Sequence, residues 1–276
     1  GLLDAWQADA QAAHQARATG ALRGPITGLP KLDSDLGGCL APGMSILHGT
    51  PGVGKTAFAL QLATSCGFPA LYVTCEMAPL ELFRRVTART TGTFLGRLKT
   101  GELLPEASLA LARQAVEAAP LLAFADATQA YASPEWIRDK ALAVKGKHPH
   151  LLLVVDSVHS WAEGAPGGAP EYDALNEHLA ALRKLAAGLR CPVLAIAERN
   201  RASMDKGGLS AGAGTRKLEY GAEAVIDLAR KEDAREDAMG EVPVTCRLAK
   251  NRHGAVGKRS EERRVGKSVV SRVDLG

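Results

Sequence analysis

The sequence predicts an α/β fold in which a mostly parallel, twisted central sheet carries helices on both faces. From Ile26 onward, short apolar runs alternate with longer segments of helical pattern, a rhythm typical of parallel strands joined by crossover helices. The run 151–155 is apolar at every position, as expected of a central strand buried on both faces. A Gly-rich segment between one such strand and the next helix adds a third indication, because parallel α/β sheets often bind ligands there.

The expected elements follow in order along the chain. Residues 1–23 are predicted to form an Ala- and Gln-rich helix, which Gly24 and Pro25 end. The expected strands are 44–48, 70–74, 121–125, 151–155, 192–197, 224–229 and 243–249. The expected helices are 55–66, 79–90, 105–118, 134–146 and 172–189, three of which have a proline at or near the start, where no N–H is needed. Gly-rich loops are expected at 163–170 and 207–214, and a charged hairpin at 230–241.

Composition limits the cellular compartment and the kinds of binding partner that can be expected. The 276 residues are 46% hydrophobic and only 4% aromatic, which suits one large aliphatic domain with or without an appendage. No apolar run approaches about 20 residues, so no membrane span is expected. The five scattered cysteines lack metal-ligand spacing and have apolar neighbours, which favours buried thiols in a reducing, cytoplasmic compartment. Much of the net charge of +4 lies in the tail from Lys258, so bulk charge says little about nucleic acid.

The segment 49–56 fits the pattern G-x-x-x-x-G-K-[ST] of a phosphate-binding loop, and we call it the phosphate loop. Its glycines let successive backbone N–H groups point at phosphate oxygens, and the following helix directs its N-terminus at the same anion. Lys55 is expected to reach the β- and γ-phosphates, and Thr56 to ligate Mg²⁺. The residues expected to contact the nucleotide are Gly49, Thr50, Pro51, Gly52, Val53, Gly54, Lys55 and Thr56.

Two carboxylates follow expected strands. Asp156 ends the apolar run 151–155, where an aspartate can hold the Mg²⁺ shell; the alternative is an aspartate that caps the next loop. Glu76 follows the strand 70–74, where it can orient and deprotonate an attacking water; the alternative is an acid favoured near a helix start.

Basic and acidic residues gather after the last two parallel strands. Glu198 follows strand 192–197 and suits a sensor of the γ-phosphate. The basic residues expected to contact a nucleic acid backbone are Arg199, Arg201, Lys206, Arg216 and Lys217, although an ordinary solvated loop would look the same. Lys250 and Arg252 follow the last strand; Arg252 fits an arginine finger in its own chain or in a neighbour, against the alternative of a basic turn.

Taken together, these segments resemble a RecA-like ATPase domain, closest to the C-terminal motor domain of DnaB-type replicative helicases. The resemblance rests on segments in a fixed order: 27–33, the phosphate loop, Glu76 with its following helix, 98–103, Asp156, 219–223 and 249–254, the last similar to the K-x-R-x-G finger motif. It covers about Ile26 to Gly257. The order and spacing make it far more specific than the phosphate loop alone.

The resemblance implies a hexameric ring with ATP and Mg²⁺ at subunit interfaces. Lys55, Thr56, Glu76 and Asp156 would act from one subunit, and Lys250 and Arg252 on the neighbour's γ-phosphate. Loops near 161–170 and 202–217 would face a central channel that holds single-stranded DNA. A primase or a loader would be a further partner.

The sequence departs from the family in several places. Glu198 stands where family members usually have Gln, and a carboxylate there would repel a γ-phosphate unless Arg199 or Arg201 offsets it. Asp156-Ser157 resembles RadA-type recombination ATPases more than DnaB. The N-terminal primase-binding domain of DnaB is missing, which suggests a fragment, for example of a phage or plasmid primase–helicase. After Gly257 the chain shows no strand period, and residues from about 259 resemble adapter-derived sequence; the rival interpretation is a basic tail that binds DNA.

The leading hypothesis is therefore an ATP-hydrolysing motor that translocates on or unwinds DNA. The alternatives are a RadA-like recombination ATPase and a KaiC-like assembly switch that moves no DNA; a small-molecule kinase would want an Arg-rich lid, which the sequence lacks. The expected organisation is a helical linker at 1–24, a RecA-like ATPase core at 25–257, and a basic tail at 258–276 that is non-native or disordered.

Overall fold

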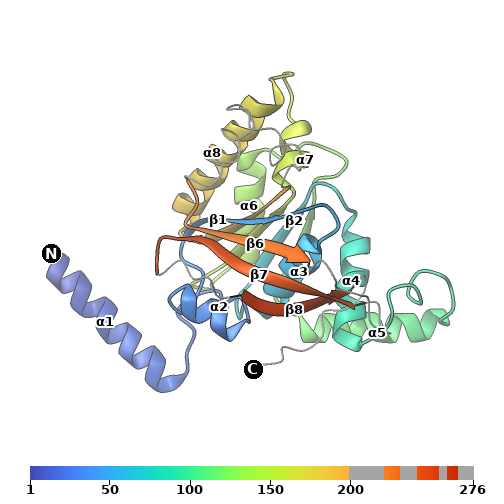
Figure 1. Cartoon of the computed structure of the whole chain (residues 1–276), viewed down its shortest axis with the longest axis horizontal. Coiled ribbons are helices and arrows are strands. Elements are labelled where there is room, and N and C mark those ends of the chain that lie inside the picture. The colour runs from blue at the N-terminus through green and yellow to red at the C-terminus, as the bar shows by residue number, and fades with distance from the viewer. Residues whose placement is uncertain (199–220, 231–240, 255–259, 267–276) are drawn as a thin grey trace.

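The computed structural model describes residues 1–198, 221–230, 241–254 and 260–266. These residues form an eight-stranded sheet with helices on both faces (Figure 1). The strands are β1 (Gly43–Gly49), β2 (Ala70–Thr74), β3 (Leu122–Asp126), β4 (Leu152–Asp156), β5 (Pro192–Glu198), β6 (Ala224–Arg230), β7 (Glu241–Asn251) and β8 (Ser260–Gly266). The helices are α1 (Leu2–Thr19), α2 (Pro30–Asp35), α3 (Lys55–Ser65), α4 (Pro79–Thr91), α5 (Pro105–Ala118), α6 (Pro134–Lys145), α7 (Val158–Glu163) and α8 (Glu171–Leu189).

The strand order is β3-β2-β4-β5-β1-β6-β7-β8. The first six strands in this order are parallel, and β7 and β8 are each antiparallel to the strand before them. The register places Gly49 beside Glu198 and Thr74 beside Asp156. The C-terminal ends of β1, β2, β4 and β5 therefore meet at one edge of the sheet, which we call the carboxyl edge. The predicted α/β fold with a mostly parallel sheet is confirmed.

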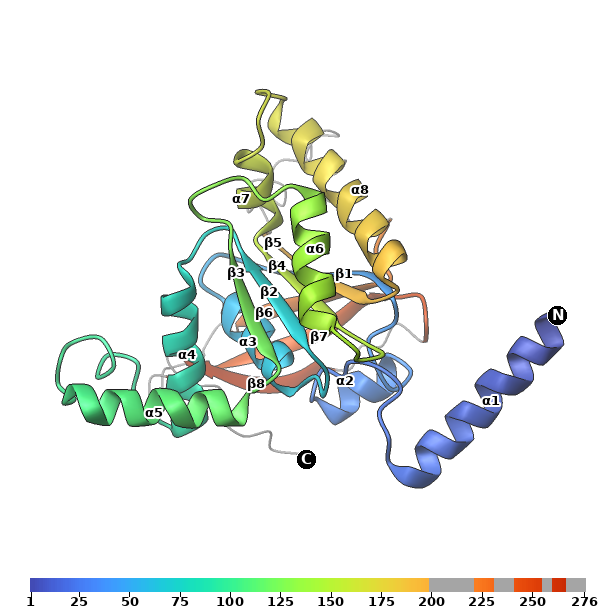
Figure 2. The ribbon, with the colours of Figure 1, turned by 180° about the vertical axis from the view of Figure 1, so that it is seen from behind.

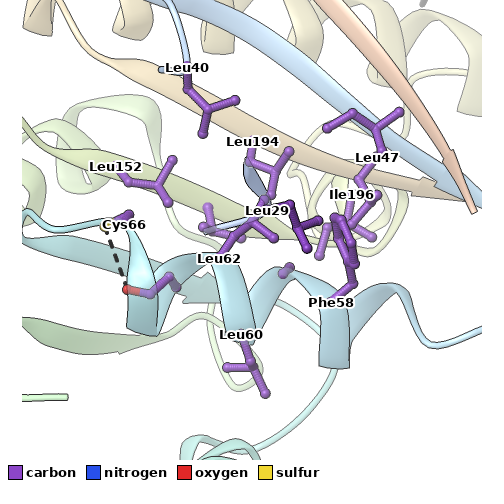
Figure 3. Close-up of a cluster of buried hydrophobic side chains, with 14 of the residues drawn as sticks. Leu29, Leu40, Leu47, Phe58, Leu60, Leu62, Cys66, Leu152, Leu194 and Ile196 are labelled. Carbon is purple, nitrogen blue, oxygen red and sulfur yellow. Dashed lines mark hydrogen bonds between the residues drawn. The ribbon is translucent and has the colours of Figure 1, made fainter. Parts of the chain in front are cut away.

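Two apolar layers hold the helices on the sheet. On one face α3 packs on the central strands, and Figure 3 shows Phe58 directed from α3 toward Ile196 and Leu47. On the other face α6, α7 and α8 cover the sheet, and Figure 2 shows α6 lying across the strands. Trp161 of α7 is 2% exposed and donates its indole N–H to the Ala132 carbonyl oxygen at 2.7 Å. Burial of β4 on both faces explains its continuous apolar run.

Every expected strand and helix is present within a few residues of its predicted bounds, and three further elements were not predicted. Two are the six-residue helices α2 and α7, and α7 occupies the start of the region near 161–170 that we expected to be a loop. The third is β8, which pairs with β7 although the tail has no strand period. Pairing at a sheet edge uses backbone groups, so it does not require alternating side chains. The expected loop at 207–214 lies outside the described residues.

The first helix stands apart from the body of the molecule in both views (Figures 1 and 2). It has no buried residue, and Trp6 is 77% exposed. All five cysteines are free; Cys66, Cys191 and Cys246 are buried as expected, whereas Cys39 and Cys75 are only partly buried, which corrects that expectation. None of the described helices is long and apolar enough to cross a membrane.

Candidate nucleotide-binding site

The phosphate loop joins β1 to α3 at the carboxyl edge, as predicted. Gly54 is the N-cap of α3 with φ 105°, a left-handed conformation that residues with a β-carbon rarely adopt. Gly49 is required for a different reason, because a β-carbon there would lie 2.5 Å from Val53 Cγ1 and 3.1 Å from the Leu228 carbonyl oxygen. The backbone of the loop thus curls at the N-terminus of α3, where unpaired N–H groups and the helix dipole favour an anion.

The Lys55 side chain lies folded over the phosphate loop. Its Nζ donates to the carbonyl oxygens of Gly49 at 2.9 Å and Thr50 at 3.2 Å. Burial lowers the pKa of Lys55, and three nearby carboxylates oppose that shift: Glu198, Asp156 and Glu76. Arg85 also acts on Asp156, so two cations face three carboxylates, and the site favours a further cation between protein and phosphate.

Thr56 and Asp156 meet directly at the head of α3. The Thr56 hydroxyl donates to Asp156 Oδ2 at 2.8 Å, although the two residues are 100 positions apart. A hydroxyl and a carboxylate oxygen are the ligand types that Mg²⁺ prefers, and Mg²⁺ is commonly held by one or two carboxylates together with substrate phosphates. No group of three or more His, Cys, Asp or Glu that could hold a metal occurs among the described residues. The residues present therefore fit Mg²⁺ bound together with a nucleotide.

Asp156 is buried at the end of β4, with 5% of its surface exposed. Desolvation raises the pKa of its carboxyl, and hydrogen bonds from Tyr72 and Thr56 oppose that shift. The Tyr72 hydroxyl donates to the same Oδ2 atom at 2.6 Å. Asp156 does not cap the segment that follows it. That role belongs to Ser157, the N-cap of α7, whose hydroxyl accepts the Ser160 N–H.

Glu76 follows β2 at the same edge. Burial raises the pKa of its carboxyl, and the charges of Asp156 and Glu198 raise it further, while Lys55 lowers it. A carboxylate with a raised pKa is a stronger base, which is the property that proton removal from water requires. The expected juxtaposition of Glu76, Asp156 and Lys55 is therefore present at the carboxyl edge.

Glu198 ends β5 beside Gly49, and its side chain is exposed. The Glu198 backbone N–H donates to Nδ1 of His159 of α7 at 3.5 Å. Burial lowers the pKa of His159, so the imidazole is neutral near neutral pH and does not offset the Glu198 charge. The charge of Glu198 does act on Lys55, where it opposes the effect of burial on the lysine pKa.

Lys250 and Arg252 lie far from the phosphate loop of their own chain. Asn251 pairs with Ala224, Ala224 pairs with Ser45, and the phosphate loop begins four residues further along β1 at Gly49. At about 3.3 Å per residue, the end of β7 is roughly 13 Å from the carboxyl edge, and it is at the opposite edge of the sheet. Arg252 Nη1 lies 3.4 Å from Glu223 Oε1, and the Arg252 side chain is 51% exposed.

The remaining predicted residues, Arg199, Arg201, Lys206, Arg216 and Lys217, lie outside the described residues. The structure adds three that sequence reasoning missed. Arg230 of β6 donates to the Gly52 carbonyl oxygen at 2.7 Å and so contacts the phosphate loop. Tyr72 contacts Asp156, and His159 lies against Glu198. No motif marks these residues, because each contact depends on which strands are neighbours in the sheet.

Comparison with known proteins gives a consistent result. The model of the family described as DnaB-like helicase C terminal domain matches residues 24–261. The replicative DNA helicase DnaB of Rickettsia bellii is 30% identical over 197 residues, which cover 65% of this chain and 38% of that protein. A structure described as that of a DnaB-like replicative helicase and its interactions with primase superposes with a TM-score of 0.75 at 20% identity, and covers 98% of this chain and 66% of the other. A second solved structure, described as an ATPase domain, superposes with a TM-score of 0.73 at 19% identity, with 92% of this chain and 93% of the other covered.

The matches cover different fractions of the two kinds of relative. This chain spans well under half of the Rickettsia helicase, but it matches nearly all of the ATPase domain. The structural likeness below 25% identity supports the RecA-like fold.

Proposed function

The chain belongs to the family of DnaB-like helicase C-terminal domains, and from that premise we propose that it is an ATP-hydrolysing motor domain that translocates on or unwinds DNA. One observation carries the proposal most. The phosphate loop, Asp156 and Glu76 share the carboxyl edge, while Arg252 lies at the opposite edge of the same sheet. A molecule built in this way offers a nucleotide site at one edge and a cation for a neighbour's site at the other.

Each residue at the carboxyl edge has a role in phosphoryl transfer to water. Lys55, released from the Gly49 and Thr50 carbonyl oxygens, turns to the β- and γ-phosphates. Thr56 and Asp156 would hold Mg²⁺, which would supply positive charge against the negative charge that develops on the phosphate oxygens. Glu76 orients the attacking water and accepts its proton, a task that its raised pKa favours. The nucleotide is ATP in this proposal.

Arg252 and Lys250 act in a neighbouring subunit. Their position at the opposite edge supports a closed ring in which each interface joins one copy's phosphate loop to the next copy's finger. The ring is a hexamer in this proposal, as the family resemblance implies. A head-to-tail interface of this kind uses two different surfaces of each subunit.

The proposed DNA contacts lie in the central channel of that ring. Arg199, Arg201, Lys206, Arg216 and Lys217 contact the strand backbone, and the exposed loop 164–170 faces the same channel. Single-stranded DNA is the partner, and a primase or a loader is a further one. In this organisation residues 1–24 form a helical linker, 25–257 the ATPase core, and 258–276 a basic tail, of which β8 adds the last strand to the sheet.

The test is nucleotide hydrolysis with and without single-stranded DNA, alongside a mass measurement of the assembly. We expect the hydrolysis rate to rise at least severalfold when DNA is added, and the mass to correspond to a ring of subunits. A DNA-independent rate together with no DNA binding at low salt would contradict the motor and favour an assembly switch.

Replacing Glu198 by Gln is expected to tighten nucleotide binding. Glu198 adds a third carboxylate around Lys55, so removal of its charge weakens the repulsion of a triphosphate. The repulsion between this one charge and the triphosphate in a partly solvated site is about 1 kcal/mol, which corresponds to about fivefold in Kd. DNA-stimulated hydrolysis should be preserved or raised. Titration with a fluorescent ATP analogue measures the change, and unchanged or weaker binding in the variant would contradict a repulsion between Glu198 and the phosphates.

A further inference from the structure

Tyr72 is a fully buried polar residue that the proposed mechanism leaves without a role. It lies on β2, opposite Val154 of β4, and Asp156 is two residues further toward the carboxyl edge. Side chains two residues apart on a strand share a face, so Tyr72 and Asp156 lie on the same face, about 7 Å apart along the strand direction. A long side chain directed toward the carboxyl edge spans this separation, and the Tyr72 hydroxyl does so.

Two hydroxyl groups converge on one carboxylate oxygen. Tyr72 donates to Asp156 Oδ2 at 2.6 Å, and Thr56 donates to the same atom at 2.8 Å. The Tyr72 bond has the short length typical of an O–H donor to a charged carboxylate. A metal ion would take an oxygen lone pair of Thr56 and leave its O–H able to donate, so both hydroxyls can hold Oδ2, and Tyr72 is the donor that is not itself a candidate metal ligand.

The surroundings hold the Tyr72 ring in place. Its side chain has 0% exposure within the apolar layer between β2 and α3, and its ring lies against Phe124 with centroids 5.9 Å apart. A buried carboxylate without a donor is costly, so its orientation follows the position of its donor. A rigid donor therefore fixes the direction in which the other Asp156 oxygen points.

We infer that Tyr72 is a positioning residue, whose hydroxyl holds the Asp156 carboxylate in the orientation that supports a metal ion bound with nucleotide. The inference rests on the proposed role of Asp156. If Tyr72 only filled the core, Tyr72→Phe would leave the MgCl₂ requirement unchanged, because phenylalanine keeps the ring and its packing and loses only the hydroxyl.

The experiment compares Tyr72→Phe with the unmodified chain and with Tyr131→Phe. Tyr131 is a matched control because its hydroxyl also makes one hydrogen bond, at 3.1 Å to His178 Nε2, on the other face of the sheet. The readouts are the MgCl₂ concentration for half-maximal binding of a fluorescent, non-hydrolysable ATP analogue, and the Tm of the nucleotide-free protein. Neither requires turnover.

We expect Tyr72→Phe to raise the half-maximal MgCl₂ concentration about tenfold, the fold-change of one hydrogen bond to a charged group. Binding of the analogue in EDTA should be unchanged. Tyr131→Phe should leave both quantities unchanged. A wild-type MgCl₂ requirement in Tyr72→Phe, whatever its Tm, would overturn the inference.

Asp156→Asn distinguishes a failure of the role inferred for Tyr72 from a failure of the role proposed for Asp156. If Tyr72 acts through Asp156, adding Tyr72→Phe to Asp156→Asn should cause no further rise in the MgCl₂ requirement, because interacting residues are not additive. A full tenfold effect in that background would overturn the inference. If Asp156→Asn itself leaves the MgCl₂ dependence intact, the proposed role of Asp156 fails, and the role of Tyr72 fails with it. If Asp156→Asn abolishes the dependence but Tyr72→Phe has no effect, only the inference about Tyr72 fails.

Discussion

Lys55→Ala is expected to weaken nucleotide binding by at least about 100-fold, which corresponds to about 2.7 kcal/mol for the charged hydrogen bonds lost. The reason is the local balance of charge. Lys55 is the cation on which all three carboxylates Glu198, Asp156 and Glu76 act, and without it they outnumber Arg85, the cation that remains beside Asp156. Equilibrium titration with a fluorescent ATP analogue measures the effect, and hydrolysis should fall with it.

The matched control is Lys140→Ala. Lys140 is exposed on α6, and its Nζ lies 5.5 Å from the centroid of the Trp136 ring. Its removal also deletes one positive charge, but on the face of the sheet opposite α3, so nucleotide affinity should not change. Unchanged affinity in Lys55→Ala, with circular dichroism showing a folded protein, would refute the assignment of the phosphate loop.

The fold was predictable because its signals are local. Strand β4 shows a continuous apolar run since both its faces are covered, and α4, α5 and α6 begin at prolines that mark their first turns. The elements that were missed carry weaker signals. Helix α7 has six residues, which is too short for a helical period, and its N-cap Ser157 follows Asp156, for which only metal binding and capping of a loop were considered.

The candidate site was predictable only in part, for a different physical reason. The phosphate loop is one continuous segment, so its pattern alone identifies it. The contact between Tyr72 and Asp156 joins residues 84 positions apart, and it exists because β2 and β4 are neighbours in the sheet. The contact between Arg230 and Gly52 similarly requires β6 to lie beside β1. Strand order determines such contacts, and no single segment of sequence encodes it.

Arg252→Ala is expected to leave nucleotide binding intact and to reduce turnover about 10³-fold, the lower end of the effect of an arginine finger. Binding persists because Arg252 lies at the opposite edge from the phosphate loop of its own chain. Turnover falls because the neighbour's γ-phosphate loses a positive charge in the transition state. Arg247→Ala is the matched control: Arg247 is exposed on β7, the strand that Arg252 follows, and pairs with Asp227 at 3.1 Å, so its loss should leave turnover unchanged.

A mixing experiment shows whether the finger acts between subunits. In a ring that contains both variants, a site with intact Glu76 from an Arg252→Ala subunit can face an intact Arg252 from a Glu76→Ala subunit. Neither variant forms such an interface alone. If subunits assemble at random in equal amounts, about a quarter of the interfaces in a closed head-to-tail ring combine both intact groups. Hydrolysis should therefore return to a fraction of the wild-type rate that peaks near equal amounts, whereas a rate that stays at the level of the two inactive variants at every ratio would mean that Arg252 does not act on a neighbour's nucleotide.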